Sequence, residues 1–404
     1  MIQTSPASSH ALPAVNPVPV SRVLAIDAFR GITMLVMIFV NTLAGVRGMP
    51  AWLEHMPPDV DGMTFVDVVF PAFLFIVGMS IPFALNQRRN DPLVRQQGHI
   101  LQRAVGLLVL GVFMVNAEEG FNEAAMHMSI YLWSLLFYGC AILVWNVYRF
   151  SNPYIAPALR TAGIAGLIVL GWQFRGGPTG ELHLAPQWWG ILGLIGWAYL
   201  YSCIIYQLCR GKIAGLLTAL VLCLAYYCLG HSGTNPDTFW FGQTENAAHT
   251  SIALAGLLCS VLYFEPSLQL DIRQRYLRAT MLVAALVAAG VWLRPWFKIS
   301  KNAATPTWCL YSAAICIVLF GLLYWIIDLK KWQGWTAFFK PAASNPLLIY
   351  LIPYIVYNLL QYLRIDLPPL LQQGLPGLAW SAGYAIAIMY LAVGLNHLKI
   401  RLQL

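Results

Sequence analysis

The sequence predicts an all-α membrane protein, a polytopic helical bundle with about twelve transmembrane helices and a range of ten to twelve. Of its 404 residues, 59% are hydrophobic and only 10% are charged, whereas an average soluble domain has about 25% charged residues. Apolar runs near the roughly 20 residues needed to cross a bilayer recur along the whole chain. Because no segment is left for a separate soluble domain, residues 22–404 are predicted to form one transmembrane domain.

The first 20 residues are rich in Pro, Ser and Ala and carry no Lys, Arg, Asp or Glu. A signal peptide has a basic start and a compact apolar core before its cleavage site, and this segment has neither. Residues 1–21 are therefore predicted to be a disordered tail.

The predicted spans follow the apolar runs along the chain. The third and fifth runs are the shortest, so a count of ten or eleven stays open. Thr305-Pro306 is typical of a helix start and marks the tenth span. The spans are 24–45, 63–85, 101–116, 128–148, 158–174, 189–209, 213–230, 248–264, 279–296, 308–327, 346–363 and 377–396.

The distribution of Lys and Arg predicts the orientation, because basic residues in short loops stay in the cytoplasm. Most of the 24 basic residues fall on inner segments if the N-terminus is inside. Both termini are then cytoplasmic, and the loop after the first span faces outward. Acidic residues lie mainly on the outer side, where they either attract cations or are simply solvated.

The first span contains Asp27 and Arg30, which are three residues apart and so share one helix face. Ionisable groups inside a membrane are costly and normally pair in the bundle interior. We therefore predict an ion pair near the inner end of this helix. It either locks the helix to its neighbours or lines a ligand site.

The outer loop "NTLAGVRGMPAWLEHMPPDVDGMTFVDVVFP" holds His55 near three carboxylates, among them Asp61. Histidine, with an unperturbed pKa of about 6.5, is suited to accept a proton near neutral pH. Asn41 precedes this loop at the outer end of the first span. Asp67 lies one turn into the second span, where it either complements the helix dipole or orients His55.

Further polar groups precede two later spans on the same outer side. Lys301 and Asn302 come shortly before the tenth span, and His249 lies at the entry of the eighth. We interpret His249 as a structural histidine. The eight cysteines show no zinc-like spacing, so they are interpreted as buried small hydrophobic residues. No metal and no nucleic-acid partner is expected.

Several stretches resemble the heparan-alpha-glucosaminide N-acetyltransferase family and its bacterial relatives associated with N-acetylglucosamine use. They are "LAIDAFRG", "MIFVN", a histidine shortly after, and "DGMTFVDVVFPAFLFIVGMSI". "NAATPTWCLYSAA", "LYWIID" and "SNPLLIYL" resemble the family's later signature, so the likeness covers about residues 22–360. By motif, the family's active-site histidine corresponds to His55 and its nearby asparagine to Asn41.

The resemblance implies an enzyme that moves acetyl from cytosolic acetyl-CoA to an amino sugar on the far side of a bacterial inner membrane. The large luminal domain of the lysosomal members is missing from this sequence, which favours glucosamine or a terminal amino sugar as acceptor. A homodimer is expected by analogy. His55 acts either as a general base, with Asn41 at the oxyanion and Asp67 or Asp61 orienting the ring, or as an acetylated intermediate.

Acetyl-CoA carries several negative charges and must be reached from the inside. Guanidinium groups suit its phosphates, and we expect other polar residues of the matching motifs to bind the donor as well. The predicted donor-binding residues are Asp27, Arg30, Arg88, Arg89, Arg95, Arg103, Arg273, Arg275, Lys301, Asn302 and Asn345.

Two other functions stay open. A sugar transporter or flippase would use the polar residues as a pathway and make no bond, although the sequence contains no convincing internal repeat. An acyltransferase-3-like O-acetyltransferase also begins with an Asp-x-x-Arg-Gly-like helix. That family typically has a histidine where this chain has Asn41, which lowers that interpretation.

Overall fold

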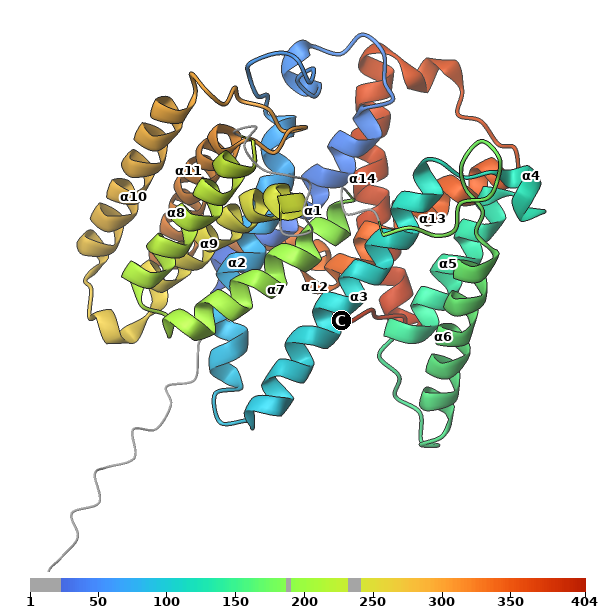
Figure 1. The fold of residues 1–404 in the computed structure, drawn as a ribbon, viewed down its shortest axis with the longest axis horizontal. Helices are drawn as coiled ribbons and strands as arrows, with labels where there is room; N and C mark the ends of the chain where they lie inside the picture. The colour runs from blue at the N-terminus through green and yellow to red at the C-terminus, as the bar shows by residue number, and fades with distance from the viewer. Residues whose placement is uncertain (1–22, 187–189, 232–240) are drawn as a thin grey trace, which may run out of the picture.

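The computed structural model describes residues 23–186, 190–231 and 241–404, so the predicted tail 1–21 lies outside the described residues. The described part contains helices and isolated bridges but no strand, and the all-helical prediction is confirmed (Figure 1). The helices are α1 (Leu24–Leu43), α2 (Val69–Gln87), α3 (Leu93–Glu118), α4 (Glu123–Met126), α5 (Ile130–Trp145), α6 (Ile155–Gln173), α7 (Ile191–Cys209), α8 (Ile213–Gly230), α9 (Thr244–Phe264), α10 (Ile272–Leu293), α11 (Pro306–Tyr324), α12 (Lys340–Ser344), α13 (Pro346–Tyr362) and α14 (Gly374–His397).

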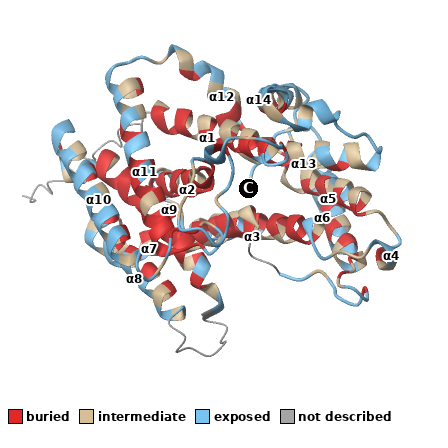
Figure 2. Ribbon diagram, turned by 90° about the horizontal axis from the view of Figure 1, so that it is seen from above, coloured by how far each residue is buried: buried red, intermediate tan, exposed pale blue. Residues whose placement is uncertain are grey.

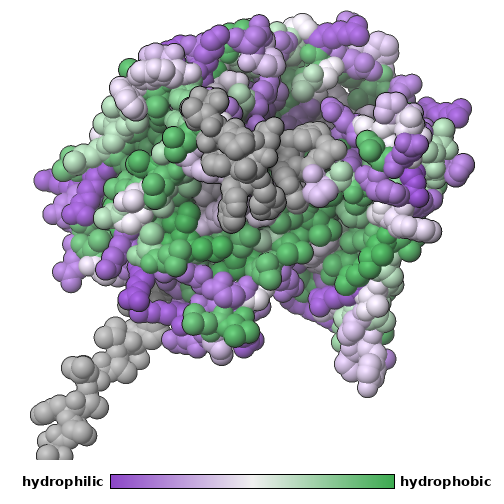
Figure 3. Space-filling view, viewed as in Figure 1, coloured by the Kyte–Doolittle hydropathy of each residue, from purple (hydrophilic) through white to green (hydrophobic). Residues whose placement is uncertain are grey.

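Within the described residues, ten helices are long and apolar enough to cross a membrane. The count is eleven if Gly334–Ser344 and Pro346–Tyr362, which meet at a bend of 69°, form one broken span. Helix α5 is apolar but has only 16 residues, and twelve spans require that it crosses as well. The predicted range is confirmed. Figure 3 shows hydrophobic side chains gathered between more hydrophilic ends, as expected of a bundle in a bilayer.

Helices α3 and α10 begin about two turns earlier than the apolar pattern predicted. Helix α3 starts at Leu93 rather than near 101, because its first two turns are polar and give no hydrophobic signal. Helix α10 starts at Ile272 rather than near 279, because Asp271 and Gln274 form a capping box. The predicted start of α11 is confirmed, since the Thr305 side chain accepts a hydrogen bond from the Trp308 N–H at 3.4 Å.

Helices α2 and α9 form the buried centre of the bundle (Figure 2). Nearly all of α9 is buried, which fits a helix that is apolar on all sides. The two helices cross closely because Gly78 of α2 and Gly256 of α9 have no side chain. A Cβ atom added at Gly78 would overlap the carbonyl oxygen of Ala253, and one at Gly256 would overlap that of Phe75.

We expect Gly78→Ala to destabilise the fold, because the new methyl group meets backbone atoms that cannot rotate away. Overpacking of this kind costs about 1 to 3 kcal/mol or more. Thermal unfolding of the detergent-solubilised protein should show a clearly lower midpoint. Gly98→Ala is the matched control, because a Cβ at Gly98 meets nothing within 4 Å. Equal midpoints for both variants would contradict the tight crossing.

The loops collect at two opposite ends of the bundle. Figure 1 shows the α1–α2 and α10–α11 connections at the top, and the α2–α3, α7–α8 and α9–α10 connections at the bottom. The His55 loop and Lys301 therefore lie at one end. Arg88, Arg89 and Arg273 lie at the other.

Candidate functional site

His55 and Asp67 form the centre of the candidate site. His55 follows a 3-10 turn at Ala51–Leu53, and Asp67 lies in the turn Val66–Val68 directly before α2. The imidazole Nδ1 is 2.7 Å from Asp67 Oδ1. Because a carboxylate only accepts hydrogen bonds, Nδ1 carries the proton and Nε2 keeps a lone pair. The His55 side chain is 38% exposed and that of Asp67 only 1%, so the imidazole can reach a substrate.

The second oxygen of Asp67 is held by the loop around it. Oδ2 accepts hydrogen bonds from the backbone N–H groups of Met56 at 3.2 Å and Thr64 at 3.0 Å. The hydroxyl of Thr64 lies 3.2 Å from the same oxygen, but its single hydrogen donates to the nearer Glu54 carbonyl at 2.7 Å. This carboxylate therefore fixes the loop and the ring together, as the outer partners of reactive histidines generally do.

Lys301, which is 246 residues from His55 in the sequence, completes the cluster. Its Nζ lies 3.2 Å from His55 Nδ1 and 3.3 Å from Nε2. Since Nδ1 already donates to Asp67, the ammonium group donates to Nε2. Burial lowers the pKa of Lys301 below its usual range, against the opposing attraction of Asp67. Lys301 is one of the acetyl-CoA-binding residues predicted from the sequence, and the structure places it beside the His55 imidazole.

Asp61 joins two loops rather than contacting His55. One of its oxygens accepts from the Ile299 N–H at 2.8 Å, and the other pairs with Arg294 Nε at 3.1 Å. The Gly62 N–H donates to the Ile299 carbonyl at 3.1 Å. The Ile299 hydrogen bond is the largest cause that lowers the pKa of Asp61 below its usual range. These contacts bring the segment with Lys301 against the segment with His55.

Trp308 contacts the backbone of Asp67. Its indole Nε1 donates to the Asp67 carbonyl at 3.2 Å, and the side chain is completely buried. The His249 ring packs edge-on against this indole with centroids 5.9 Å apart. His249 Nδ1 donates to the Glu245 carbonyl at 2.7 Å, a local bond typical of a histidine with a packing role.

Asn41 and Asn302 lie near this end but outside the cluster. Asn41 is exposed in the last turn of α1, and Asn302 is exposed in the loop after Lys301. Within the described residues, neither side chain makes a hydrogen bond to His55 or Asp67.

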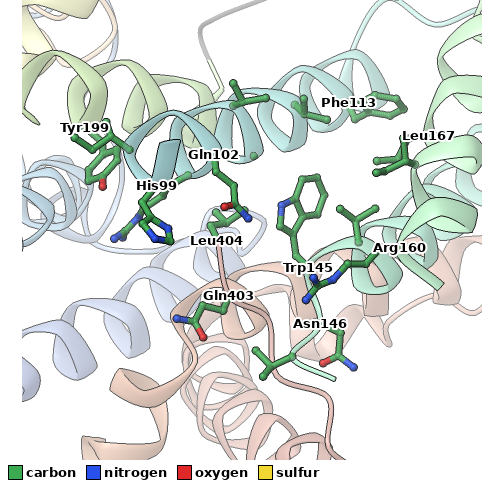
Figure 4. A pocket seen from close by; sticks show the side chains of 18 of the residues that line it. His99, Gln102, Phe113, Trp145, Asn146, Arg160, Leu167, Tyr199, Gln403 and Leu404 are labelled. Carbon is green, nitrogen blue, oxygen red and sulfur yellow. The ribbon is translucent and has the colours of Figure 1, made fainter. Parts of the chain in front are cut away.

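A cavity with a volume of about 1000 Å³ lies along α3, away from His55. Figure 4 shows side chains from α3, α6, α7 and the last residues of the chain around one hollow. Its walls on α3 run from Gln96 to Phe113, which is about 26 Å at 1.5 Å per residue. Of the predicted donor residues, Arg88 and Arg103 line it.

The polar mouth of this cavity contains groups that the sequence did not single out. His99, Gln102 and Arg160 line it beside Arg103, whose guanidinium lies 4.7 Å from the centre of the Tyr199 ring. These residues come from three helices that are distant in sequence, so no local pattern could group them.

A neighbouring hollow of about 320 Å³ shares Val147 with the large cavity. It is lined by Arg149, Lys399 and Arg401, together with Ser344 and Asn396. The segment around Arg401 pairs with the end of α5, where the Val147 N–H donates to the Arg401 carbonyl at 2.9 Å. A basic rim thus continues from one hollow to the next.

Asn345 lies at the break before α13 and beside this hollow. Its side chain caps α13 by accepting from the Leu348 N–H at 3.4 Å, and it donates to Asn396 at 3.1 Å.

Asp27 and Arg30 form the predicted ion pair of α1 at 3.3 Å, and Arg30 also donates to Ser80 of α2 at 2.8 Å.

The remaining predicted donor residues lie apart from the large cavity. Arg89 and Arg95 are exposed at the α2–α3 turn, and Arg273 is exposed on the first turn of α10. Arg275 donates to the Tyr263 carbonyl at 2.6 Å and the Leu270 carbonyl at 3.1 Å. Its guanidinium therefore holds the α9–α10 connection.

The eight cysteines are all free, and four of them are buried. The described residues contain no group of three or more His, Cys, Asp or Glu that could hold a metal ion.

These features define a multi-pass membrane protein with an Asp–His–Lys cluster at one end and a basic-rimmed cavity along α3. The chain belongs to the family described as a domain of unknown function (DUF5009), which matches residues 22–242.

The same chain is similar to heparan-alpha-glucosaminide N-acetyltransferase from two mammals. It is 30% identical to the Mus musculus protein over 116 residues, which is 28% of this chain and 17% of that protein. It is 34% identical to the Homo sapiens protein over 97 residues, or 24% of this chain and 14% of that protein. The matches thus cover only a small part of these relatives, and the chain is a membrane protein distantly related to them.

Proposed function

We propose that this protein is an acetyl-CoA-dependent N-acetyltransferase that acetylates the amine of glucosamine or a terminal amino sugar. The observation that carries the proposal is the His55 imidazole, whose Nδ1 is fixed by Asp67 and whose Nε2 can accept a proton once Lys301 moves away from it. The distant similarity to an N-acetyltransferase supports the reaction type.

In the direct mechanism, the amine nitrogen attacks the thioester carbonyl carbon while His55 Nε2 takes the proton from the amine. The carbonyl oxygen becomes negative in the tetrahedral intermediate. Lys301 moves from Nε2 to this oxygen and stabilises it, which is the role predicted for Asn41 from the motif. The intermediate then expels the CoA thiolate, and the proton held by His55 passes to that sulfur.

A second mechanism forms an acetyl-imidazole first. Nε2 attacks the thioester carbon and CoA leaves as a thiolate. The amine then attacks the acetyl carbon, the bond to Nε2 breaks, and the amine proton passes through Nε2 to the thiolate. Labelled acetyl trapped on the protein in the absence of acceptor would support this route. The direct route predicts no such adduct.

We further propose that the CoA moiety enters by the basic rim and that its thin arm extends toward the His55 end. Arg88, Arg103 and Arg160 at the large cavity, with Arg149 and Arg401 next to it, can bind phosphates. The basic end is then cytoplasmic, with both chain termini on that side, and the His55 end faces out of a bacterial inner membrane. A homodimer remains part of this proposal.

The test is the release of free thiol from acetyl-CoA by the purified protein. We expect release that depends on glucosamine and that yields N-acetylglucosamine by mass spectrometry. A protein that binds or moves the sugar without releasing thiol would instead be a carrier, and the proposal would fail. Acetylation of a hydroxyl group in preference to the amine would point to an O-acetyltransferase.

Lys301→Met should lower kcat by about 10 to 100 fold, because it removes a positive charge from the developing oxyanion. The charged form is the active one, and its pKa is lowered, so wild-type activity should fall on the alkaline side at a pH below that of an ordinary lysine. Lys301→Arg should keep part of the activity and move this fall to higher pH. The measurement is kcat against pH, and an unchanged alkaline limb in Lys301→Arg would contradict the role.

Arg88→Ala combined with Arg149→Ala should weaken donor binding by about tenfold or more, because each change removes a charge-assisted contact to phosphate. The KM for acetyl-CoA should rise while the KM for glucosamine stays the same. Arg273→Ala combined with Arg278→Ala is the control, since both residues lie on α10 away from the cavity. A larger effect in the control pair would move the donor site to α10.

A further inference from the structure

A smaller cavity of about 140 Å³ lies beside the C-terminal end of α3, between α3, α7 and α13. Glu118, Tyr350 and Tyr354 supply its polar side chains, and the rest of its wall is aliphatic or glycine. In Figure 1, α3 rises from the α2–α3 turn at the bottom to the region of α4, and Glu118 is the last residue of this helix.

The pocket contains one carboxyl group and no basic side chain. Glu118 forms no hydrogen bond or ion pair with the described residues, and no Lys, Arg or His lines the cavity. The Glu118 residue is exposed at the mouth, so a ligand can reach the carboxylate from outside. A carboxylate partly removed from water is costly unless a donor or a cation meets it.

Tyrosine hydroxyl groups form the base of the same pocket. The hydroxyls of Tyr350 and Tyr354 are 3.3 Å apart and share one hydrogen bond, which leaves further hydrogen-bonding capacity on both. Both tyrosines line the same cavity as Glu118.

We propose that this pocket binds the ammonium group of an amino sugar. The Glu118 carboxylate accepts from the ammonium, and the tyrosine hydroxyls exchange hydrogen bonds with the sugar hydroxyls. The tyrosine faces attract the same cation. The choice of an amino sugar as ligand rests on the proposed function. The site is a binding subsite, and no bond is made or broken there.

The experiment measures glucosamine binding by calorimetry to the full-length protein carrying His55→Ala, without acetyl-CoA. This substitution removes acetyl transfer, so the calorimeter measures glucosamine binding alone. We expect glucosamine to bind at least about tenfold more tightly than glucose, because glucose lacks the ammonium group. Adding Glu118→Gln should remove this preference, while Glu119→Gln, the adjacent exposed carboxylate, should keep it. Tyr350→Phe should weaken glucosamine binding by a smaller factor.

Equal affinity for glucose and glucosamine, or equal effects of Glu118→Gln and Glu119→Gln, would overturn the subsite. Thermal unfolding of each variant excludes loss of fold as the cause, since Glu118→Gln preserves shape and should not change the midpoint. The proposed function fails separately, when the wild-type protein releases no thiol with glucosamine present. If wild-type transfer occurs and Glu118→Gln leaves the KM for glucosamine unchanged, the subsite alone is wrong.

Discussion

His55→Ala is expected to abolish glucosamine-dependent thiol release, with a fall in kcat of about 100 to 10,000 fold. The side chain that accepts the proton of the amine is lost, and no other described histidine is within hydrogen-bond distance of Asp67. The fold should survive, because the imidazole is 38% exposed and fills no core position. The measurement is kcat with saturating acetyl-CoA, beside a thermal unfolding curve for the same sample.

His183→Ala is the control for this change, because His183 is an exposed histidine on another loop. It should keep wild-type turnover. Retention of more than about a tenth of the wild-type kcat in His55→Ala would contradict a role in proton transfer. Added imidazole offers a further check, since it should restore part of the lost rate if the missing group is a base.

Asp67→Asn should lower kcat by about 100 fold and also lower the unfolding midpoint. The two oxygens of Asp67 accept from the His55 Nδ1–H and from the backbone N–H groups of Met56 and Thr64. An amide has only one oxygen, so its NH₂ group must face either the Nδ1–H of His55 or the N–H donors of Met56 and Thr64. The first outcome reverses the imidazole tautomer, and the second leaves backbone donors of the loop unpaired.

Asp61→Asn is the matched comparison for Asp67→Asn. Its carboxylate binds Arg294 at the surface, where ion pairs contribute little. Its lowered pKa means that any stabilisation from Asp61 is present at neutral pH and is lost only as the pH falls through that lowered value. We expect a small change in midpoint and nearly normal kcat. Equal loss of activity in both variants would show that loop attachment, and not the orientation of His55, is the common cause.

Hydrophobic runs predicted most of the fold because bilayer-spanning helices must be apolar over a nearly fixed length. The boundaries of α8 and α13 agree with the predicted spans within one residue. The pattern failed where helices continue beyond the apolar region, as with the polar first turns of α3. It also gave no sign of the segment Gly334–Ser344, which meets α13 at a bend of 69°.

In the site too, contacts between residues close in sequence could be predicted, whereas contacts between distant residues could not. His55 and Asp67 are only twelve residues apart. The sequence left two roles open for Asp67, and orientation of the His55 ring is one of them. Lys301 is 246 residues from His55, and Trp308 is 241 residues from Asp67. Their contacts arise because Asp61 and Ile299 fasten two loops together, which no local spacing encodes. The basic rim near Arg401 has the same origin, since that segment pairs with residues after α5.

Acetyl transfer across the membrane tests the central claim most directly. The purified protein would be placed in sealed vesicles with acetyl-CoA on one side only and glucosamine on the other, with orientation established by labelling a cysteine introduced beside His55. We predict N-acetylglucosamine on the side where His55 is exposed, free CoA on the opposite side, and neither product with His55→Ala. Product formed only when both substrates share one side would contradict the account.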